Sequence, residues 1–321
     1  MIIGRKLACV AICAAASMLA LAIDALAQEG RVGPPPEPAN LVTKDGIQLK
    51  GTFFPGPARA GSMQGKQTTP VILLHDFKSS RAVFTPLIDA LQSGGGDGPF
   101  FAVMAVDLRA HGESVTQQLP DGSQAALDAS KLSKEGLAAM ATLDMEAVRS
   151  FLVDKNDAGE LNLNKLCIVG SGMGASVATN WAAQDWAAPP LAVGKQGQDA
   201  KALVLVSPRW SYNGLSMQDA MRFGAFKQNV AWLMICGAQD SKMKTDFDRI
   251  HKQLEKSHPA AKKAGQQAPS GLQVVLVPSS LQSDTLLSQS AQAVYPQIVA
   301  FLTENVAAVQ QPWLSRRSRI P

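Results

Sequence analysis

The sequence predicts an α/β fold in which a mostly parallel, doubly wound sheet carries helices on both faces. Two observations lead to this class. Short, continuous apolar runs are typical of strands that are buried on both faces, and segments with helical periodicity lie between them. Their alternation along one chain indicates parallel strands joined by right-handed crossovers. The chain has 321 residues, 46% of them hydrophobic and 17% charged, which suits one large domain.

The chain begins with a stretch typical of a secretory signal peptide. Arg5-Lys6 precede an apolar run, Leu7 to Ile23, and Ala25-Leu26-Ala27 forms a cleavage site of small residues. We therefore expect residues 1–27 to be removed, and the mature protein to be periplasmic or extracellular without a stable membrane span. The alternative is an uncleaved anchor, but the run is short for a span and ends at Asp24.

Three regions are expected after the signal peptide. Residues 28–40 are a proline-rich spacer, because RVGPPPEP can join neither a helix nor a central strand. Residues 41–306 form the folded domain, which starts with a hairpin around the Asp45-Gly46 turn. Residues 307–321 carry three arginines and are expected to be a disordered basic tail.

Within the domain, the remaining strands and helices are predicted from the continuous apolar runs and from the segments with helical periodicity. Residues 185–201 contain two prolines and two glycines, so we expect a loop there and no large cap. The carboxyl ends of the parallel strands should share one edge of the sheet, where ligands of such folds bind. Buried strands are predicted at 71–74, 101–106, 166–169, 202–206, 231–236 and 272–277, and helices at 84–92, 136–155, 176–183, 216–226, 245–256 and 291–306.

The stretch Lys165 to Ala175, KLCIVGSGMGA, breaks from an apolar run into glycines at alternate positions. A buried strand, a sharp glycine-lined turn and a helix resemble the nucleophile elbow of α/β-hydrolases. Three further motifs occur in the order of that superfamily: His75-Asp76-Phe77, DLRAHGES at 107–114 and CGAQD at 236–240. Residues 41–306 are therefore identified as similar to the α/β-hydrolase superfamily, and the resemblance implies its fold.

The resemblance also implies where a catalytic triad would stand, in the chain order nucleophile, acid, histidine. The nucleophile position is Gly172, which has no side chain and tolerates the positive φ of an elbow. The acid position is Asp240, for which the alternative is a helix cap or a solvated loop carboxylate. The histidine position is Gln282, and glutamine cannot accept a proton near neutral pH. The expected triad is thus degenerate.

By the same resemblance, an oxyanion hole would remain. The backbone N–H groups of Met173 and of a residue near Phe77 would point at an anionic oxygen, and Asp76 would lie in this pocket. Main-chain donors do not depend on the missing serine. A pocket that binds carbonyl or carboxylate groups is therefore possible in principle.

A metal site is an alternative hypothesis, because imidazole and carboxylate groups are zinc ligands. Its ligands would be the side chains clustered at the ends of neighbouring strands, His75, Asp76, Asp107 and His111. Histidine and aspartate at similar places in the superfamily brace loops, so we expect no metal and no cofactor. Cys167 and Cys236 should be buried thiols that are too far apart to pair, since the strand at 202–206 would run between them.

Three functions remain open from the sequence. The first is an exported pseudo-hydrolase that binds a small-molecule or protein ligand in its cleft, and this is the one we expect. The second is an active esterase that uses Ser171 or Ser207 with His75 or His111. The third is a metal-dependent hydrolase built on the histidine and aspartate cluster. The formal charge of +4 is too small for this length to indicate a nucleic-acid partner.

Overall fold

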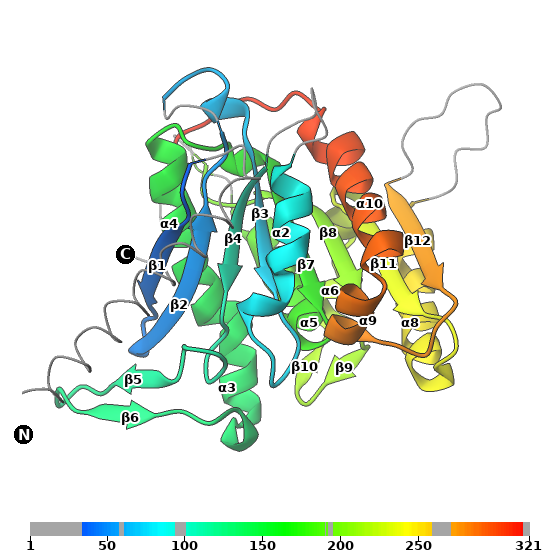
Figure 1. Ribbon diagram of the computed structural model, residues 1–321, viewed down its shortest axis with the longest axis horizontal. Coiled ribbons are helices and arrows are strands. Elements are labelled where there is room, and N and C mark those ends of the chain that lie inside the picture. Colours follow the sequence, from blue (N-terminus) through cyan, green and yellow to red (C-terminus); the bar gives the residue numbers. More distant parts are fainter. Residues whose placement is uncertain are drawn as a thin grey trace, which may run out of the picture.

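The computed structural model describes residues 34–57, 61–93, 101–189, 191, 195–258 and 271–316. The expected signal peptide, the start of the spacer and residues 317–321 lie outside these ranges. Within them the chain forms a central twisted sheet between two layers of helices (Figure 1).

The central sheet has the strand order β12-β11-β8-β7-β3-β4-β2-β5-β6, with β1 also paired to β2. The strands from β4 to β12 in this order are parallel, and β1, β2, β5 and β6 add antiparallel pairs. A short β9–β10 ribbon stands apart. The bounds are β1 Glu37–Val42, β2 Ile47–Phe54, β3 Thr69–Leu74, β4 Phe101–Val106, β5 Thr116–Gln118, β6 Gln124–Ala126, β7 Leu166–Ser171, β8 Ala200–Val206, β9 Ser211–Tyr212, β10 Leu215–Ser216, β11 Ala231–Gly237 and β12 Leu272–Val277.

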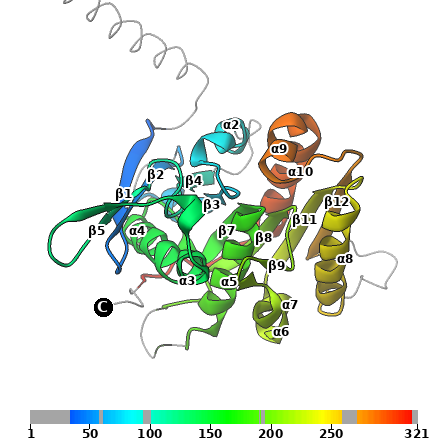
Figure 2. The same ribbon diagram turned by 90° about the horizontal axis from the view of Figure 1, so that it is seen from below.

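Helices cover both faces of the sheet, and each layer closes its own hydrophobic core (Figure 2). One face carries α2, α9 and α10, and the other carries α3 to α8. This arrangement confirms the predicted fold class, and strand β8 separates the free thiols of Cys167 and Cys236. The bounds are α2 Thr85–Gln92, α3 Lys134–Ala139, α4 Met145–Asp157, α5 Met173–Ala187, α6 Gln218–Arg222, α7 Gly224–Asn229, α8 Ser241–Glu255, α9 Ser283–Gln289 and α10 Ala291–Leu302.

Membrane-spanning helices are missing from the described part of the chain, where every helix is too short or too polar to cross a bilayer.

Some element boundaries differ from the sequence-based expectation. Strand β1 begins at Glu37, inside the expected spacer, and Pro38 fits there because an edge strand tolerates the missing N–H. The single helix expected at 136–155 is divided by a π-helical turn, Met140–Asp144. That turn carries the fully buried Asp144, which forms an ion pair with Arg109 at 2.6 Å.

The segment 310–316, called the C-terminal strap below, is packed against the domain, contrary to the expected disordered tail. The side chains of Asn162 and Asn156 donate to the carbonyls of Gln311 and Leu314, each at 3.0 Å. The Arg316 side chain is buried and lies 3.1 Å from the carboxylate of Asp199. The strap is therefore held in place by the hydrogen bonds that its carbonyls accept and by the buried ion pair of Arg316 with Asp199.

Candidate functional site

The turn between β7 and α5 has the geometry of the expected elbow. Strand β7 ends at Ser171 and α5 begins at Met173, so Gly172 alone makes the turn. Its φ of 51° and ψ of −109° lie where side-chain-bearing residues are strained. The Gly172 N–H donates to the Val206 carbonyl at 2.9 Å, which fixes the turn against the end of β8.

The carboxylate of Asp76, on the loop after β3, lies directly against this turn. Its Oδ1 accepts the N–H of Met173 at 2.7 Å and the N–H of Phe77 at 2.7 Å. These are the two main-chain donors that the superfamily resemblance assigned to an oxyanion hole. They converge on one oxygen, and that oxygen belongs to the protein itself.

The same carboxylate occupies the space that a side chain at position 172 would need. A Cβ built on Gly172 overlaps Cγ, Oδ1 and Oδ2 of Asp76. The two residues therefore fit together only because position 172 is glycine. A serine at this position would need both a strained backbone and a displaced Asp76.

Gln282, at the position expected for a histidine, is the residue before α9 and is held by three hydrogen bonds. Its Oε1 accepts from the Ser207 hydroxyl at 2.7 Å and from the Gly237 N–H at 3.3 Å, and its Nε2 donates to the Gly237 carbonyl at 2.8 Å. The Ser207 hydroxyl also accepts the N–H of Ser283 at 2.8 Å. Gln282 thus joins the ends of β8, β11 and the loop before α9.

Asp240, at the position expected for the acid, caps α8. Its Oδ1 accepts the N–H groups of Lys242 and Met243, each at 3.0 Å. A carboxylate that accepts two amides at a helix start stabilises that helix. Among the described contacts, Asp240 has no bond with Gln282, so the acid and histidine positions are not linked here.

The two histidines of the suggested metal cluster have structural roles. His75 Nε2 accepts the Leu108 N–H at 3.1 Å, and its Nδ1 lies 2.7 Å from the Asp76 carbonyl. His111 Nδ1 lies 2.8 Å from the Arg109 carbonyl, and the buried Nε2 has no hydrogen-bond partner among the described residues. Burial lowers the pKa of both imidazoles, which keeps them neutral near pH 7.

Asp107, the other acidic member of that cluster, is buried and already saturated. Its carboxylate accepts the Arg81 N–H at 2.6 Å and the Glu113 N–H at 2.9 Å, and it forms an ion pair with the Arg81 guanidinium. Over the ranges that the structure describes, no three histidine, cysteine, aspartate or glutamate side chains are grouped as metal ligands.

The alternative serine nucleophiles are not paired with a base in the described structure. The Ser171 hydroxyl is buried without a hydrogen-bond partner. The Ser207 hydroxyl is engaged by Gln282 and Ser283. Activation of a serine requires a base within hydrogen-bond reach, and within the described residues neither hydroxyl forms a hydrogen bond with a histidine.

Asp284, which the sequence did not single out, completes the site. Its Oδ2 accepts the N–H of Asp76 at 3.2 Å, so the first turn of α9 is tied to the loop after β3. The only signal in the sequence was its place two residues after Gln282, the position expected for the histidine. Nothing local in the sequence indicates that Asp76 accepts from residue 173, because that contact spans about a hundred residues.

Comparisons with known proteins concern the fold and the family of the chain. The family model described as "Alpha/beta hydrolase family" matches residues 71–313. Comparison with curated proteins gives no match. A carboxyl esterase from Bacillus coagulans has a similar fold, with a TM-score of 0.58 at 12% identity, over 85% of this chain and 99% of that one. So has the peroxisomal alpha-beta-hydrolase Lpx1 from Saccharomyces cerevisiae, with a TM-score of 0.55 at 11% identity, over 87% and 90% of the two chains.

Proposed function

This chain belongs to the alpha/beta hydrolase family, and we propose that it is an exported member that has lost serine-hydrolase catalysis and keeps the fold for binding. The fold places a strand, an elbow and a helix where the family's chemistry takes place. The residues at that place do not supply an attacking group or a base.

The observation that carries the proposal is the position of the Asp76 carboxylate. Acyl transfer by a serine enzyme requires an attacking hydroxyl and two donors aimed at the oxygen that becomes negative. In this protein Asp76 fills the space of a side chain at position 172 and accepts both donors, Phe77 N–H and Met173 N–H. One residue therefore blocks both requirements.

Gln282 supports the same conclusion from the other side of the site. An amide oxygen does not take a proton near neutral pH. Its hydrogen bonds with Ser207 and Gly237 use the side chain for structure, by joining two loops. The proposed ligand is a small molecule or another protein that occupies the cleft.

The proposal is tested by exposing the protein without residues 1–27 to a fluorophosphonate probe and to short-chain nitrophenyl esters, with and without EDTA. We expect neither labelling nor turnover. Labelling would overturn the proposal and identify a relocated serine by mapping, whereas turnover abolished by EDTA would support a metal-dependent hydrolase.

A pair of variants tests the role of Asp76 in the same assay. Gly172→Ser with Gln282→His should remain unlabelled, because the serine side chain and the Asp76 carboxylate compete for the same space, and the displaced carboxylate stays beside the new hydroxyl. Adding Asp76→Ala should allow labelling at position 172. Equal labelling of the double and triple variants would mean that Asp76 does not obstruct the site.

Export is proposed from the N-terminal sequence alone, which has the charged start, apolar run and small-residue site of a signal peptide. Expression of the whole chain in a bacterium, followed by N-terminal sequencing of the periplasmic fraction, should give a chain that begins near Gln28. Intact protein in the cytoplasm would refute export.

A further inference from the structure

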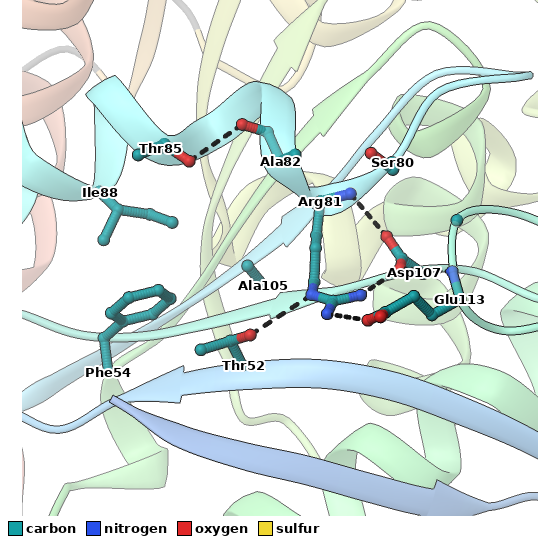
Figure 3. Close-up of a pocket in the computed structure, with 11 residues that line it drawn as sticks. Thr52, Phe54, Ser80, Arg81, Ala82, Thr85, Ile88, Ala105, Asp107 and Glu113 are labelled. Atoms are coloured by element: carbon teal, nitrogen blue, oxygen red, sulfur yellow. Dashed lines mark hydrogen bonds and ion pairs between the residues drawn. The ribbon is translucent and has the colours of Figure 1, made fainter. Parts of the chain in front are cut away.

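A pocket lies between strands β2 and β4 and the start of α2 (Figure 3). Its volume is about 290 Å³. Phe54, Ile88 and Ala105 form an apolar end, and the Arg81 side chain stands at the opposite, polar end (Figure 3). None of the triad positions lines this pocket, which shares with the site described above only Asp107 and its partners Arg81 and Glu113.

The guanidinium of Arg81 connects three polar groups of the pocket. Its Nε donates to the Thr52 hydroxyl at 3.3 Å, its Nη1 pairs with Asp107, and its Nη2 pairs with Glu113. Asp107 is 1% exposed and is fixed by two backbone N–H groups as well. Asp107 is therefore the permanent counter-ion of Arg81.

Glu113 is a different kind of partner. Its side chain is 67% exposed, and Arg81, with a weaker contribution from Lys50, holds the pKa of its carboxyl below the usual value. The carboxylate thus marks a place where two cations favour a negative group. Since exposed ion pairs contribute little to stability, Glu113 can leave that place at small cost.

We propose that this pocket binds a small monocarboxylate with a short alkyl chain, whose carboxylate replaces that of Glu113 on Arg81 and whose chain lies against Phe54 and Ile88. The proposal goes beyond the lost hydrolase function, because it assigns a separate binding site. Glu113 acts in it as a displaceable internal competitor.

The shape and charge of the pocket favour this ligand class over others. With about 30 Å³ per water-sized group, the volume holds roughly eight to ten non-hydrogen atoms, which corresponds to a chain of about six carbons with its carboxylate. A metal cation would have to displace the Arg81 guanidinium from both carboxylates. A much longer alkyl chain would extend out of the pocket into solvent.

The test is a calorimetric titration of hexanoate into the protein without residues 1–27 and into two charge-matched variants. Glu113→Gln removes the competitor, and Glu135→Gln removes the same charge from an exposed site on α3. We expect Glu113→Gln to bind hexanoate roughly fivefold more tightly than either the wild type or Glu135→Gln, since an exposed ion pair contributes up to about that factor. Equal affinities of the two variants would overturn the displacement of Glu113.

Two further measurements separate the parts of the site. Hexan-1-ol, which has the same chain without the charge, should bind more weakly than hexanoate and should not distinguish Glu113→Gln from Glu135→Gln. Ala82→Trp places a large ring at the exposed rim of the pocket and should abolish hexanoate binding without a change in the core. Undiminished binding to Ala82→Trp would place the ligand elsewhere and refute the proposal.

Discussion

The contact between Gly172 and Asp76 predicts a strong energetic coupling between two residues far apart in sequence. Gly172→Ala introduces a Cβ at φ 51°, where backbone strain costs about 1–3 kcal/mol. The same Cβ overlaps the Asp76 carboxylate and forces it off the N–H groups of Phe77 and Met173. Losing two charge-assisted bonds in a half-buried place adds about 2–3 kcal/mol. The total expected loss in unfolding free energy is about 3–6 kcal/mol.

The overlap contribution disappears when the carboxylate is absent, which makes a double-mutant cycle the appropriate measurement. In an Asp76→Ala background, Gly172→Ala should cost only the strain, about 1–3 kcal/mol. The coupling energy should therefore be about 2–3 kcal/mol. Asp76→Asn is the matched control, because the amide keeps the shape of the carboxylate and should preserve much of the coupling.

Urea-induced unfolding at 25 °C, followed by tryptophan fluorescence, gives the four free energies. If the two single changes are additive within about 0.5 kcal/mol, the carboxylate does not occupy the place assigned to it. If Gly172→Ala alone costs less than about 1 kcal/mol, the strained geometry of the elbow is wrong as well.

Three further predictions concern stability. Burial lowers the pKa of His111 in the folded state below its unfolded value of about 6.5, so protonation favours the unfolded state and the free energy of unfolding falls as the pH drops below 6.5. Between pH 7 and pH 5, the free energy of unfolding should therefore fall less in His111→Gln than in the wild type. An equal fall in both proteins would refute this role of His111. Gln282→Ala should lower the unfolding free energy by about 1–3 kcal/mol, because the hydrogen bonds of the Gln282 side chain are structural. An unchanged free energy of unfolding would contradict that role. Arg316→Met should lower the unfolding free energy by about 3 kcal/mol, because it removes a buried partner of Asp199. Arg222→Met, which breaks an exposed ion pair, should leave the unfolding free energy nearly unchanged. Equal losses in the two variants would refute the contribution of the strap to stability.

Much of the fold was predictable because its strands are buried on both faces and appear as uninterrupted apolar runs. The strands at 71–74, 101–106 and 231–236 are examples, and each lies within an observed strand. The hairpin β5–β6 was missed, because its residues are largely exposed and polar and carry no such run.

The candidate site was predictable to a smaller extent. The elbow at Gly172 was predictable from the local sequence, because glycines at alternate positions directly after an apolar run indicate a sharp turn at the end of a strand. The hydrogen bond from Met173 to Asp76 depends on how β3 and β7 pair, and no local pattern encodes it. The same holds for Arg316, whose burial depends on a carboxylate at Asp199.

The C-terminal strap has a consequence for the order in which the molecule assembles. A chain is made from its N-terminus, so Asp199 and Arg149, which form an ion pair at 3.1 Å, are both present before Arg316. The side-chain amides of Asn156 and Asn162 likewise form their hydrogen bonds with the carbonyls of the strap only after the strap has been made. The edge of the sheet at the amino ends of β7 and β8 therefore closes only once the strap is present, and truncation before residue 310 would leave it open.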